Sequence, residues 1–531
     1  MSWRCLGLTV TSIVFLVSAA VGTNAPGHET RDHAILEIQH LIEAGDLVQA
    51  RRVLQTAAHD FPQDAGFDNL LGVIEVQDGH YVAAESAFLR AVRRDTKFTG
   101  AYLNLGRLYQ EDFPANPQAP GKALAIYKKV LTYDGENEEA NYQSGSLLLR
   151  QGAFEQSLVH LLRLPASTQK TAQTLSLICA AYAGLRKRNQ TDEVFAQLRL
   201  IPEFSQPDLR QMLPGLRAGE RNDLIISAAE SLERREPLSA DIEHSLALAY
   251  EASGRLAEAR STLERFVTHD SLSVAGLMEL ARVAHEQKDY PGSLGYLAHA
   301  RDLDPTNASI HYSFGLVCLD QDLIAEARNS FEKAVQLKPE NPDYNYMMGV
   351  TSVFRHDPGE AVPYFQKYLA LKPKDARGEL ALGVAFFRAK DYDSALPWFT
   401  KAAATSATAT TAHYYLGALA IEQDRLDDAR SQLELAIQAN PNYADALSEL
   451  GHYYFLKKDY PESEKWLERA LRADSNHFSA NFFLLTLYAR TGDPRRETQA
   501  KRYDDLAKLQ EQKNRDVMRL VEVRPFETPQ P

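Results

Sequence analysis

Apolar and polar positions along the chain form amphipathic stretches that recur in blocks of 34 residues. Counted from Ala240, seven blocks follow one another without an insertion or a deletion and end at residue 477. Each block contains two amphipathic stretches around a short polar turn, for example Lys390-Asp391-Tyr392. The pattern therefore predicts two helices per block, joined by that turn.

Small residues stand at fixed places in these blocks. The eighth place holds Ala247, Ala281, Gly315, Gly349, Gly383, Gly417 and Gly451, and the twentieth holds Ala or Ser throughout. Small side chains at these two places let the two helices approach closely, while bulky residues such as those at the twenty-fourth place fill the space between them. The thirty-second place holds Pro305, Pro339, Pro373 and Pro441. Proline there ends the second helix, because it cannot continue one.

This arrangement resembles the tetratricopeptide repeat family. The resemblance implies an all-α fold, an α-solenoid superhelix of tandem helix-turn-helix repeats, in which each unit buries its apolar face against its neighbours. It also implies that the first helices line a concave groove. We expect such a protein to work by binding protein or peptide segments.

The repeat pattern divides the chain into six regions. We predict a signal peptide or anchor at 1–25, about four repeats at 31–164, degenerate helical repeats at 165–239, seven repeats at 240–477, a C-terminal capping repeat at 478–511 and a tail at 512–531. One upstream repeat has a lengthened loop at 113–121, between its helices. In 165–239 the register is lost among prolines that include Pro214, although 173–185 and 223–233 still read as amphipathic helices. A hinge or an inserted module is the alternative there.

The N-terminus has the order of a secretory signal. One basic residue, Arg4, precedes an uncharged, largely apolar run over residues 5–21, and Ala20-Val21-Gly22 fits the small-x-small cleavage rule. The alternative is an uncleaved membrane anchor, for which seventeen residues are at the short limit. We therefore expect an exported protein, periplasmic or secreted, that contacts a membrane only if residues 5–21 are retained.

Charge and motifs argue against several other functions. The formal net charge of −13 argues against nucleic acid as the main ligand. The sequence has no phosphate-binding glycine loop, no zinc-protease motif and no paired Cys-x-x-Cys, so we expect no catalytic residues, no cofactor and no metal site. Cys179 and Cys318 lie in apolar stretches, where a free cysteine acts as a small hydrophobe.

By the family's positions, the downstream first helices present an apolar and aromatic stripe to the groove. The predicted partner-binding residues are Tyr312, Leu316, Tyr346, Val350, Phe354, Phe387, Arg388, Tyr414, His452, Phe455 and Phe482. The upstream groove is more polar, with Gln39, Asn69, Gln77, Arg107, Gln110, Glu111 and Arg150. Some of the aromatic residues could equally pack between adjacent first helices as part of the core. The leading hypothesis is an exported scaffold; the alternative is a membrane-tethered structural spacer or a self-assembling solenoid, in either case without a peptide ligand.

Overall fold

The protein is all-α in the computed structural model, which describes residues 26–111, 117–269, 273–354 and 357–519. In these ranges 29 helices follow one another in tandem pairs and no strand occurs, which confirms the predicted α-solenoid. None of the helices in the described ranges combines the length and apolar character that crossing a membrane requires. The predicted signal or anchor at 1–25 lies outside the described residues.

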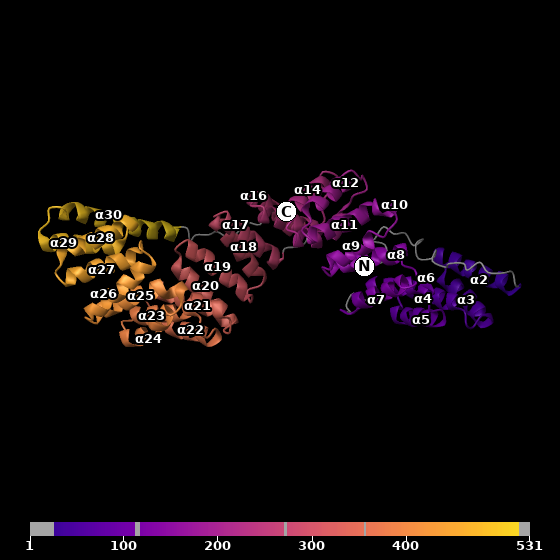
Figure 1. Ribbon diagram of the computed structural model, residues 1–531, viewed down its shortest axis with the longest axis horizontal. Coiled ribbons are helices and arrows are strands. Elements are labelled where there is room, and N and C mark those ends of the chain that lie inside the picture. Colours follow the sequence, from indigo (N-terminus) through magenta and orange to yellow (C-terminus); the bar gives the residue numbers. More distant parts are fainter. Residues whose placement is uncertain (1–25, 112–116, 270–272, 355–356, 520–531) are drawn as a thin grey trace. The chain divides into compact units, whose positions relative to one another are not determined.

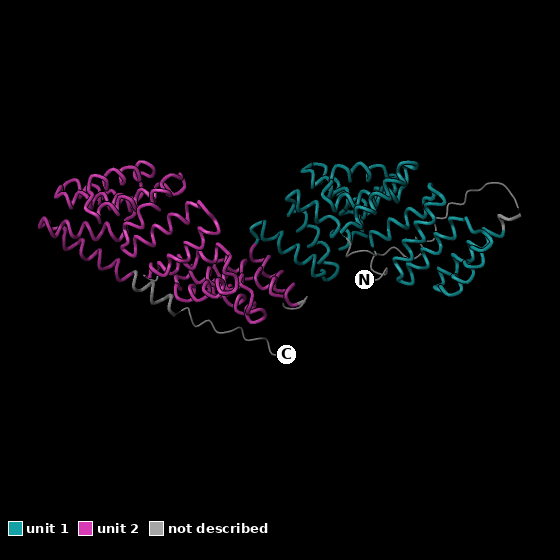
Figure 2. The backbone as a smooth tube through the Cα atoms, turned by 90° about the horizontal axis from the view of Figure 1, so that it is seen from below, with its two compact units in different colours: residues 1–255 teal, residues 256–531 magenta. Residues whose placement is uncertain are grey.

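The chain forms two compact units, residues 1–255 and 256–531 (Figure 2). The boundary falls inside the predicted 240–273 block, between its first and second helices.

In unit 1 the helices succeed one another in pairs (Figure 1). They are α2 (Pro26–Glu43), α3 (Leu47–Asp60), α4 (Ala65–Gln77), α5 (Tyr81–Arg94), α6 (Thr99–Glu111), α7 (Ala119–Leu131), α8 (Glu138–Arg150), α9 (Phe154–Leu161), α10 (Ala166–Gln169), α11 (Ala172–Gly184), α12 (Arg188–Leu198), α13 (Gln206–Ala218), α14 (Asn222–Glu233) and α15 (Ala240–Ala252).

Unit 2 continues the same alternation of first and second helices. They are α16 (Leu256–His269), α17 (Val274–Glu286), α18 (Tyr290–Leu303), α19 (Ala308–Asp320), α20 (Ile324–Leu337), α21 (Pro342–Phe354), α22 (Pro358–Leu371), α23 (Ala376–Arg388), α24 (Tyr392–Ala403), α25 (Ser406–Glu422), α26 (Leu426–Ala439), α27 (Ala444–Leu456), α28 (Tyr460–Ala473), α29 (Phe478–Thr491) and α30 (Arg496–Arg519). The last helix extends beyond residue 511, so 512–519 are helical, and the rest of the predicted tail lies outside the described residues.

Glycine at the eighth place sets the distance between the helices of a pair. A Cβ atom added to Gly383 would lie 2.7 Å from the ring of Phe399, which occupies the twenty-fourth place on the facing helix. Gly349 stands in the same relation to Phe365. The predicted close approach of the two helices is therefore confirmed, and a bulky side chain fills the space that the glycine leaves.

The turn between paired helices also matches the prediction. Lys390 adopts a left-handed conformation, with φ of 61°, and the carboxylate of Asp391 then accepts a hydrogen bond from the Ser394 amide at 3.2 Å. That bond satisfies one of the free amides at the start of α24. The second helices α18, α20, α22 and α26 each end two residues before the proline of the thirty-second place.

The prediction for one loop needs correction, and one of the prolines of the irregular middle lies inside a helix. The lengthened upstream loop is shorter than predicted, because α7 begins at Ala119 and Pro120 lies in its first turn. Proline fits there, since the first amides of a helix have no partner inside it. Pro214 does not interrupt a helix but lies within α13.

Residues 165–239 form the short helix α10 and two helix pairs, and α11 and α14 confirm the helices predicted at 173–185 and 223–233. Their packing departs from that of the regular repeats, because α13 lies directly against α11. A Cβ atom added to Gly215 would lie 2.0 Å from the carbonyl oxygen of Ala180. Gly215 therefore allows two first helices to touch through their backbones.

Candidate partner-binding groove

The predicted groove residues all lie on the first helices of unit 2, from α19 to α29. Three of them are exposed, namely Phe354, Arg388 and Phe482, and the other eight are half-buried. The exposed fractions of Phe354 and Phe482 are 61% and 45%, high values for phenylalanine. The face that these helices present is thus apolar and partly open.

The half-buried aromatic residues pack against one another and against the core. The ring of Tyr346 lies 5.7 Å from Phe365 and 5.1 Å from Tyr368, both on the second helix α22. Tyr414 lies 4.8 Å from Tyr415 and 5.6 Å from Tyr443. These rings are held in place by their neighbours, so each offers only one side to a partner.

Burial keeps these phenols neutral. It raises the pKa of Tyr414 far above its ordinary value, and the carboxylates of Glu449 and Asp445 add to the shift. Burial likewise raises the pKa of Tyr346, and it raises that of Tyr443 to about 12. The aromatic face therefore carries no phenolate charge near neutral pH.

His452 and Phe455 extend the face along α27. The imidazole of His452 lies 3.2 Å from the Glu449 carboxylate and stacks on the ring of Phe483 at 4.3 Å. Phe455 packs 6.0 Å from Tyr460. The two residues are thus partly engaged inside the fold, as Tyr346 and Tyr414 are.

Phe482 ends the stripe beside the last helix. Its ring lies 5.7 Å from Phe483 and 5.9 Å from Tyr503 of α30. One residue that the sequence analysis left out belongs to the same face: Leu456 is 42% exposed. It occupies the thirteenth place of its block, as Phe354 and Arg388 do, so the repeat register could have found it.

In unit 1 the corresponding face is closed by hydrogen bonds between first helices. Asn104 donates its Nδ2 hydrogen to Oδ1 of Asn69 at 3.0 Å, and both side chains are buried. Gln110 donates to Gln143 at 3.0 Å. Arg107 pairs with Glu139 at 2.8 Å. Three of the residues predicted to line an upstream groove, Asn69, Arg107 and Gln110, therefore join α4, α6 and α8 in a polar seam, the name we use for these three contacts. Of the others, Gln77, Glu111 and Arg150 are exposed, and Gln39 is half-buried on α2.

The closed face continues toward the middle of unit 1. Burial raises the pKa of Tyr142 to about 12, and the carboxylates of Glu139 and Asp208 contribute in the same direction. Asp208 lies on α13, which contacts α8 as well as α11. Tyr142 thus lies where first helices from different repeats converge.

One cluster in the described residues has the composition of a metal site. Ligand atoms of Glu75, Asp78 and His80 all lie within 4.8 Å of one another. Arg51 pairs with both carboxylates, and its hydrogen bond is the main cause that lowers the pKa of Glu75. The guanidinium of Arg51 therefore already supplies a positive charge at this cluster, and a metal ion would have to displace it.

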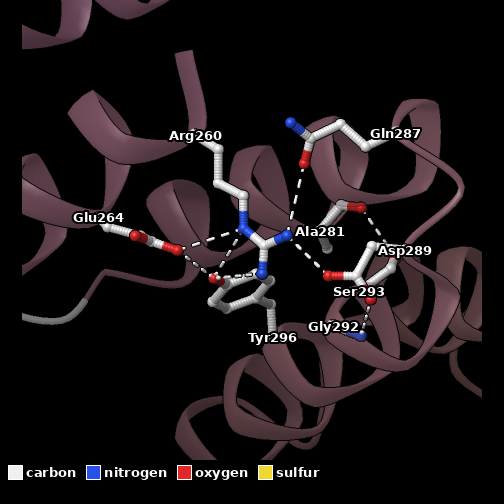
Figure 3. A network of polar contacts seen from close by, with 8 residues as sticks. All are labelled: Arg260, Glu264, Ala281, Gln287, Asp289, Gly292, Ser293 and Tyr296. Carbon is white, nitrogen blue, oxygen red and sulfur yellow. Dashed lines mark hydrogen bonds and ion pairs between the residues drawn. The ribbon is translucent and has the colours of Figure 1, made fainter. Parts of the chain in front are cut away.

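A polar network fixes the first complete helix pair of unit 2 to the preceding helix (Figure 3). Arg260 on α16 donates to Asp289 at 2.6 Å, and Tyr296 on α18 donates to Glu264 at 2.6 Å. Asp289 also accepts the amide of Gly292 at 3.0 Å, at the start of α18. Since each group has several partners within the fold, the network is structural.

Comparisons with known proteins agree with this architecture. A tetratricopeptide repeat model matches residues 35–97, 244–308, 279–342, 346–410 and 414–478, and a second model of the same description matches 118–178. No curated protein matches the chain.

Among solved structures, the APC/C hetero-tetramer Cut9-Hcn1 is 14% identical, with 86% of this chain and 96% of that chain covered and a TM-score of 0.36. Yeast Tom70 is 15% identical over 83% of this chain and 99% of that chain, with a TM-score of 0.33. YrrB, a TPR protein with an unusual peptide-binding site, is 22% identical over 41% of this chain and 95% of that chain, with a TM-score of 0.26. These similarities are too low to carry an argument about function. The first repeat model alone covers more than half of the residues, and the chain belongs to the tetratricopeptide repeat family.

Proposed function

We propose that this repeat protein is an exported scaffold that binds segments of partner proteins on the open apolar face of unit 2. The observation that carries the proposal is the exposure of large apolar side chains on three first helices of unit 2: Phe354 on α21, Leu456 on α27 and Phe482 on α29. Exposed aromatic groups of this size are typical anchors of protein interfaces. In the described part of unit 1, the first helices α4, α6 and α8 expose no large apolar side chain, and the polar seam satisfies Asn69, Arg107 and Gln110 internally.

The partner we expect is a protein segment with apolar side chains. Half-buried rings such as Tyr346 and Phe387 are held by their neighbours, so they form a preorganised floor. The exposed residues then supply contacts that are desolvated only when a partner is bound. Arg388, exposed on the same face, can pair with an acidic group of that segment.

A selection of peptides on the purified full chain tests this proposal. The variant Phe354→Glu/Leu456→Glu/Phe482→Glu changes only exposed positions, so we expect it to fold. Selected peptides should bind it at least about tenfold more weakly, since an interface anchor contributes about 1–2 kcal/mol or more. Isothermal titration calorimetry measures the affinity of each peptide for the two proteins.

A matched control uses three exposed leucines on second helices. Leu303, Leu396 and Leu435 are 46%, 36% and 40% exposed, and they lie on α18, α24 and α26. Their replacement by Glu should change peptide affinity less than about twofold, because they lie away from the first helices. Equal losses in both variants would mean that the apolar face of unit 2 is not the binding surface.

Export is a proposal that rests on the sequence of residues 1–25. Fractionation of the host followed by N-terminal sequencing tests it. A chain that begins at Thr23 outside the cytoplasm supports cleavage after Ala20-Val21-Gly22. A chain that keeps residues 5–21 and sediments with membranes supports an anchor instead.

A second candidate is a membrane-tethered spacer without a peptide ligand. It is favoured by the internal packing of Tyr346, Phe387 and Tyr414, since rings that serve the core need no partner. This candidate predicts that no peptide is selected and that the N-terminus is retained. In both cases we propose that the protein acts by binding or spacing and not by catalysis, because the sequence carries no nucleophile–base set.

A further inference from the structure

The last described helix, α30, has an exposed apolar edge against which no following helix packs among the described residues. Each second helix from α18 to α28 is followed by a first helix that packs against it. Ala436 on α26 and Ala470 on α28 are consequently fully buried. Among the described residues nothing follows α30, and Leu509 on it is 51% exposed while Leu506 is half-buried.

These leucines line an open cavity of about 360 Å³. The cavity lies between α30 and the turn that precedes α29, with Asn476, Lys501, Arg502 and Asp505 around the two leucines. Arg502 also donates to the backbone carbonyl of Ser475 at 2.7 Å, which fixes the side of the cavity next to the turn. The surface therefore combines an apolar base with a basic margin.

The chain itself contains a segment with matching chemistry. Residues 520–531 include the apolar residues Val521, Val523 and Phe526. They carry two Glu against one Arg, a net charge of −1, whereas 496–519 carries seven Lys or Arg against five Asp or Glu, a net charge of +2. An apolar, acidic segment thus follows directly on an apolar, basic surface.

The segment is long enough to reach the cavity. From Arg519 back to Leu509 the helix rises about 15 Å, at 1.5 Å per residue. An extended chain spans about 3.3 Å per residue, so residues 522–526 cover roughly 16 Å after a turn at 520–521. Phe526 can therefore lie beside Leu509 and Leu506.

We propose that residues 520–531 fold back along α30 and dock in this cavity, so that the segment covers the end of the solenoid in place of a further repeat. Phe526 covers Leu506 and Leu509, and Glu527 lies near Lys508. The proposal is independent of the groove on the first helices, so each can fail without the other.

Crosslinking between two introduced cysteines tests the docking. The variant Asp505→Cys/Glu527→Cys is made in the full chain with Cys5→Ser, and a short bismaleimide is the reagent. Cys179 and Cys318 do not interfere, because both thiols are buried and burial raises the pKa of each to about 12. We expect a crosslinked monomer as the main product at low protein concentration.

Two further substitutions distinguish docking from chance encounters. Adding Leu509→Asp or Phe526→Asp should lower the yield of crosslinked monomer at least about fivefold, since loss of one such apolar contact costs more than that factor. Adding Gln530→Asp, the matched control on the segment, should leave the yield unchanged.

Three results would overturn the proposal. A yield that does not respond to Leu509→Asp or Phe526→Asp would show that the segment does not use the cavity. A crosslinked dimer whose yield rises with concentration would assign the cavity to a second copy of the chain. Absence of any crosslink, with both cysteines freely alkylated, would show that the cavity is open to a different partner.

Discussion

The first helices of the two units present different faces, although both units are built from the same kind of helix pair. In unit 1 the face is closed: Asn69 and Asn104 hydrogen-bond to each other while buried, and α13 touches α11 through Gly215. In unit 2 the face is half open and apolar, with Phe354 61% exposed. The difference shows that the repeat fixes the pairing of helices, whereas the inner residues decide whether an apolar surface stays exposed.

The largest effect is expected from a substitution at the backbone contact between α11 and α13 in unit 1. In Gly215→Ala the new methyl group would meet the carbonyl of Ala180, which cannot move without shifting α11 or α13. We expect the free energy of unfolding of unit 1 to fall by about 3 kcal/mol or more, the range of severe overpacking. Hydrogen exchange followed by mass spectrometry reads each unit separately.

Gly383→Ala in unit 2 is the matched substitution for that experiment. Its methyl group would meet the ring of Phe399, a side chain that can shift. The expected loss is about 1–2 kcal/mol. Equal losses of unfolding free energy in the two units would mean that a close contact between two backbones is no more sensitive to an added methyl group than a contact with a side chain.

The polar seam allows a second test of the closed face. In Asn104→Leu the amide of Asn69 stays buried without its partner, and we expect a loss of about 1–3 kcal/mol in unit 1. The double variant Asn69→Leu/Asn104→Leu should recover most of that loss, because both polar groups are then absent. A double-mutant cycle by urea denaturation measures the coupling.

No recovery in the double variant would mean that the seam serves packing more than hydrogen bonding. The corresponding change in unit 2, Val350→Asn, places an amide on a half-open face where water can solvate it. It should cost less than Asn104→Leu does.

The sequence predicted the helix pairs far better than it predicted these faces. The repeat register alone was enough to assign the roles of Gly383, which faces Phe399, and of the prolines at the thirty-second place. Each of these residues has only one plausible structural role at its position. Asn69 and Arg107 have two possible structural roles, since a polar residue on the inner face can face solvent or pair with the next first helix. The role that such a residue adopts depends on the distance between neighbouring first helices. That distance cannot be predicted from the sequence of a single repeat.

The candidate site divides in the same way. Phe354 at the thirteenth place is exposed, whereas Tyr346 at the fifth place packs on α22. The sequence placed both on the inner face but left open which of them serve the core. The eleven predicted residues therefore divide between the two hypotheses. Exposed residues such as Phe354 fit a binding groove, and packed residues such as Tyr346 fit a role in the core.

The turns between paired helices show a smaller contrast between the units. In unit 1 the left-handed position is mostly glycine, at Gly45, Gly79, Gly152 and Gly254, although Arg186 and Glu220 also hold it. In unit 2 it is mostly a residue with a Cβ atom, at Lys288, Asp322, Lys390, Asp424 and Lys458, with Gly492 as the exception among the described residues. A left-handed conformation costs a residue with a Cβ atom about 1 kcal/mol. We therefore expect Lys390→Gly to raise the stability of unit 2 by up to about 1 kcal/mol, and Gly79→Lys to lower that of unit 1 similarly. Thermal melting of both variants checks the opposite signs; two changes of the same sign would contradict the argument.

The smallest expected effect concerns pH, and there the units should behave alike. In unit 1 a hydrogen bond from Arg210 lowers the pKa of Asp241 to about 2. In unit 2 burial is the largest single influence and raises the pKa of Asp289. The hydrogen bonds from Arg260 and from the Gly292 amide, together with the charge of Arg260, outweigh it, so the pKa of Asp289 is lowered too. A lowered carboxyl pKa means that the unfolded chain binds the proton more readily. The stability that the pair contributes is present above the unfolded value, about 3.9, and is lost as pH falls through the folded value.

Asp241→Asn and Asp289→Asn should therefore each flatten the loss of stability between about pH 4 and pH 2, by less than about 1 kcal/mol because both carboxylates are partly exposed. Asn at 289 can still accept the amide of Gly292, so the cap of α18 survives and the two variants remain comparable. Hydrogen exchange at pH 5 and pH 3 measures the change in each unit. Each ion pair joins neighbouring helices of its own unit and is partly exposed, which is why we expect the same response from both units. A response confined to unit 1 or to unit 2 would mean that a pair between first helices, such as Arg210–Asp241, and a pair between second helices, such as Arg260–Asp289, contribute differently to stability.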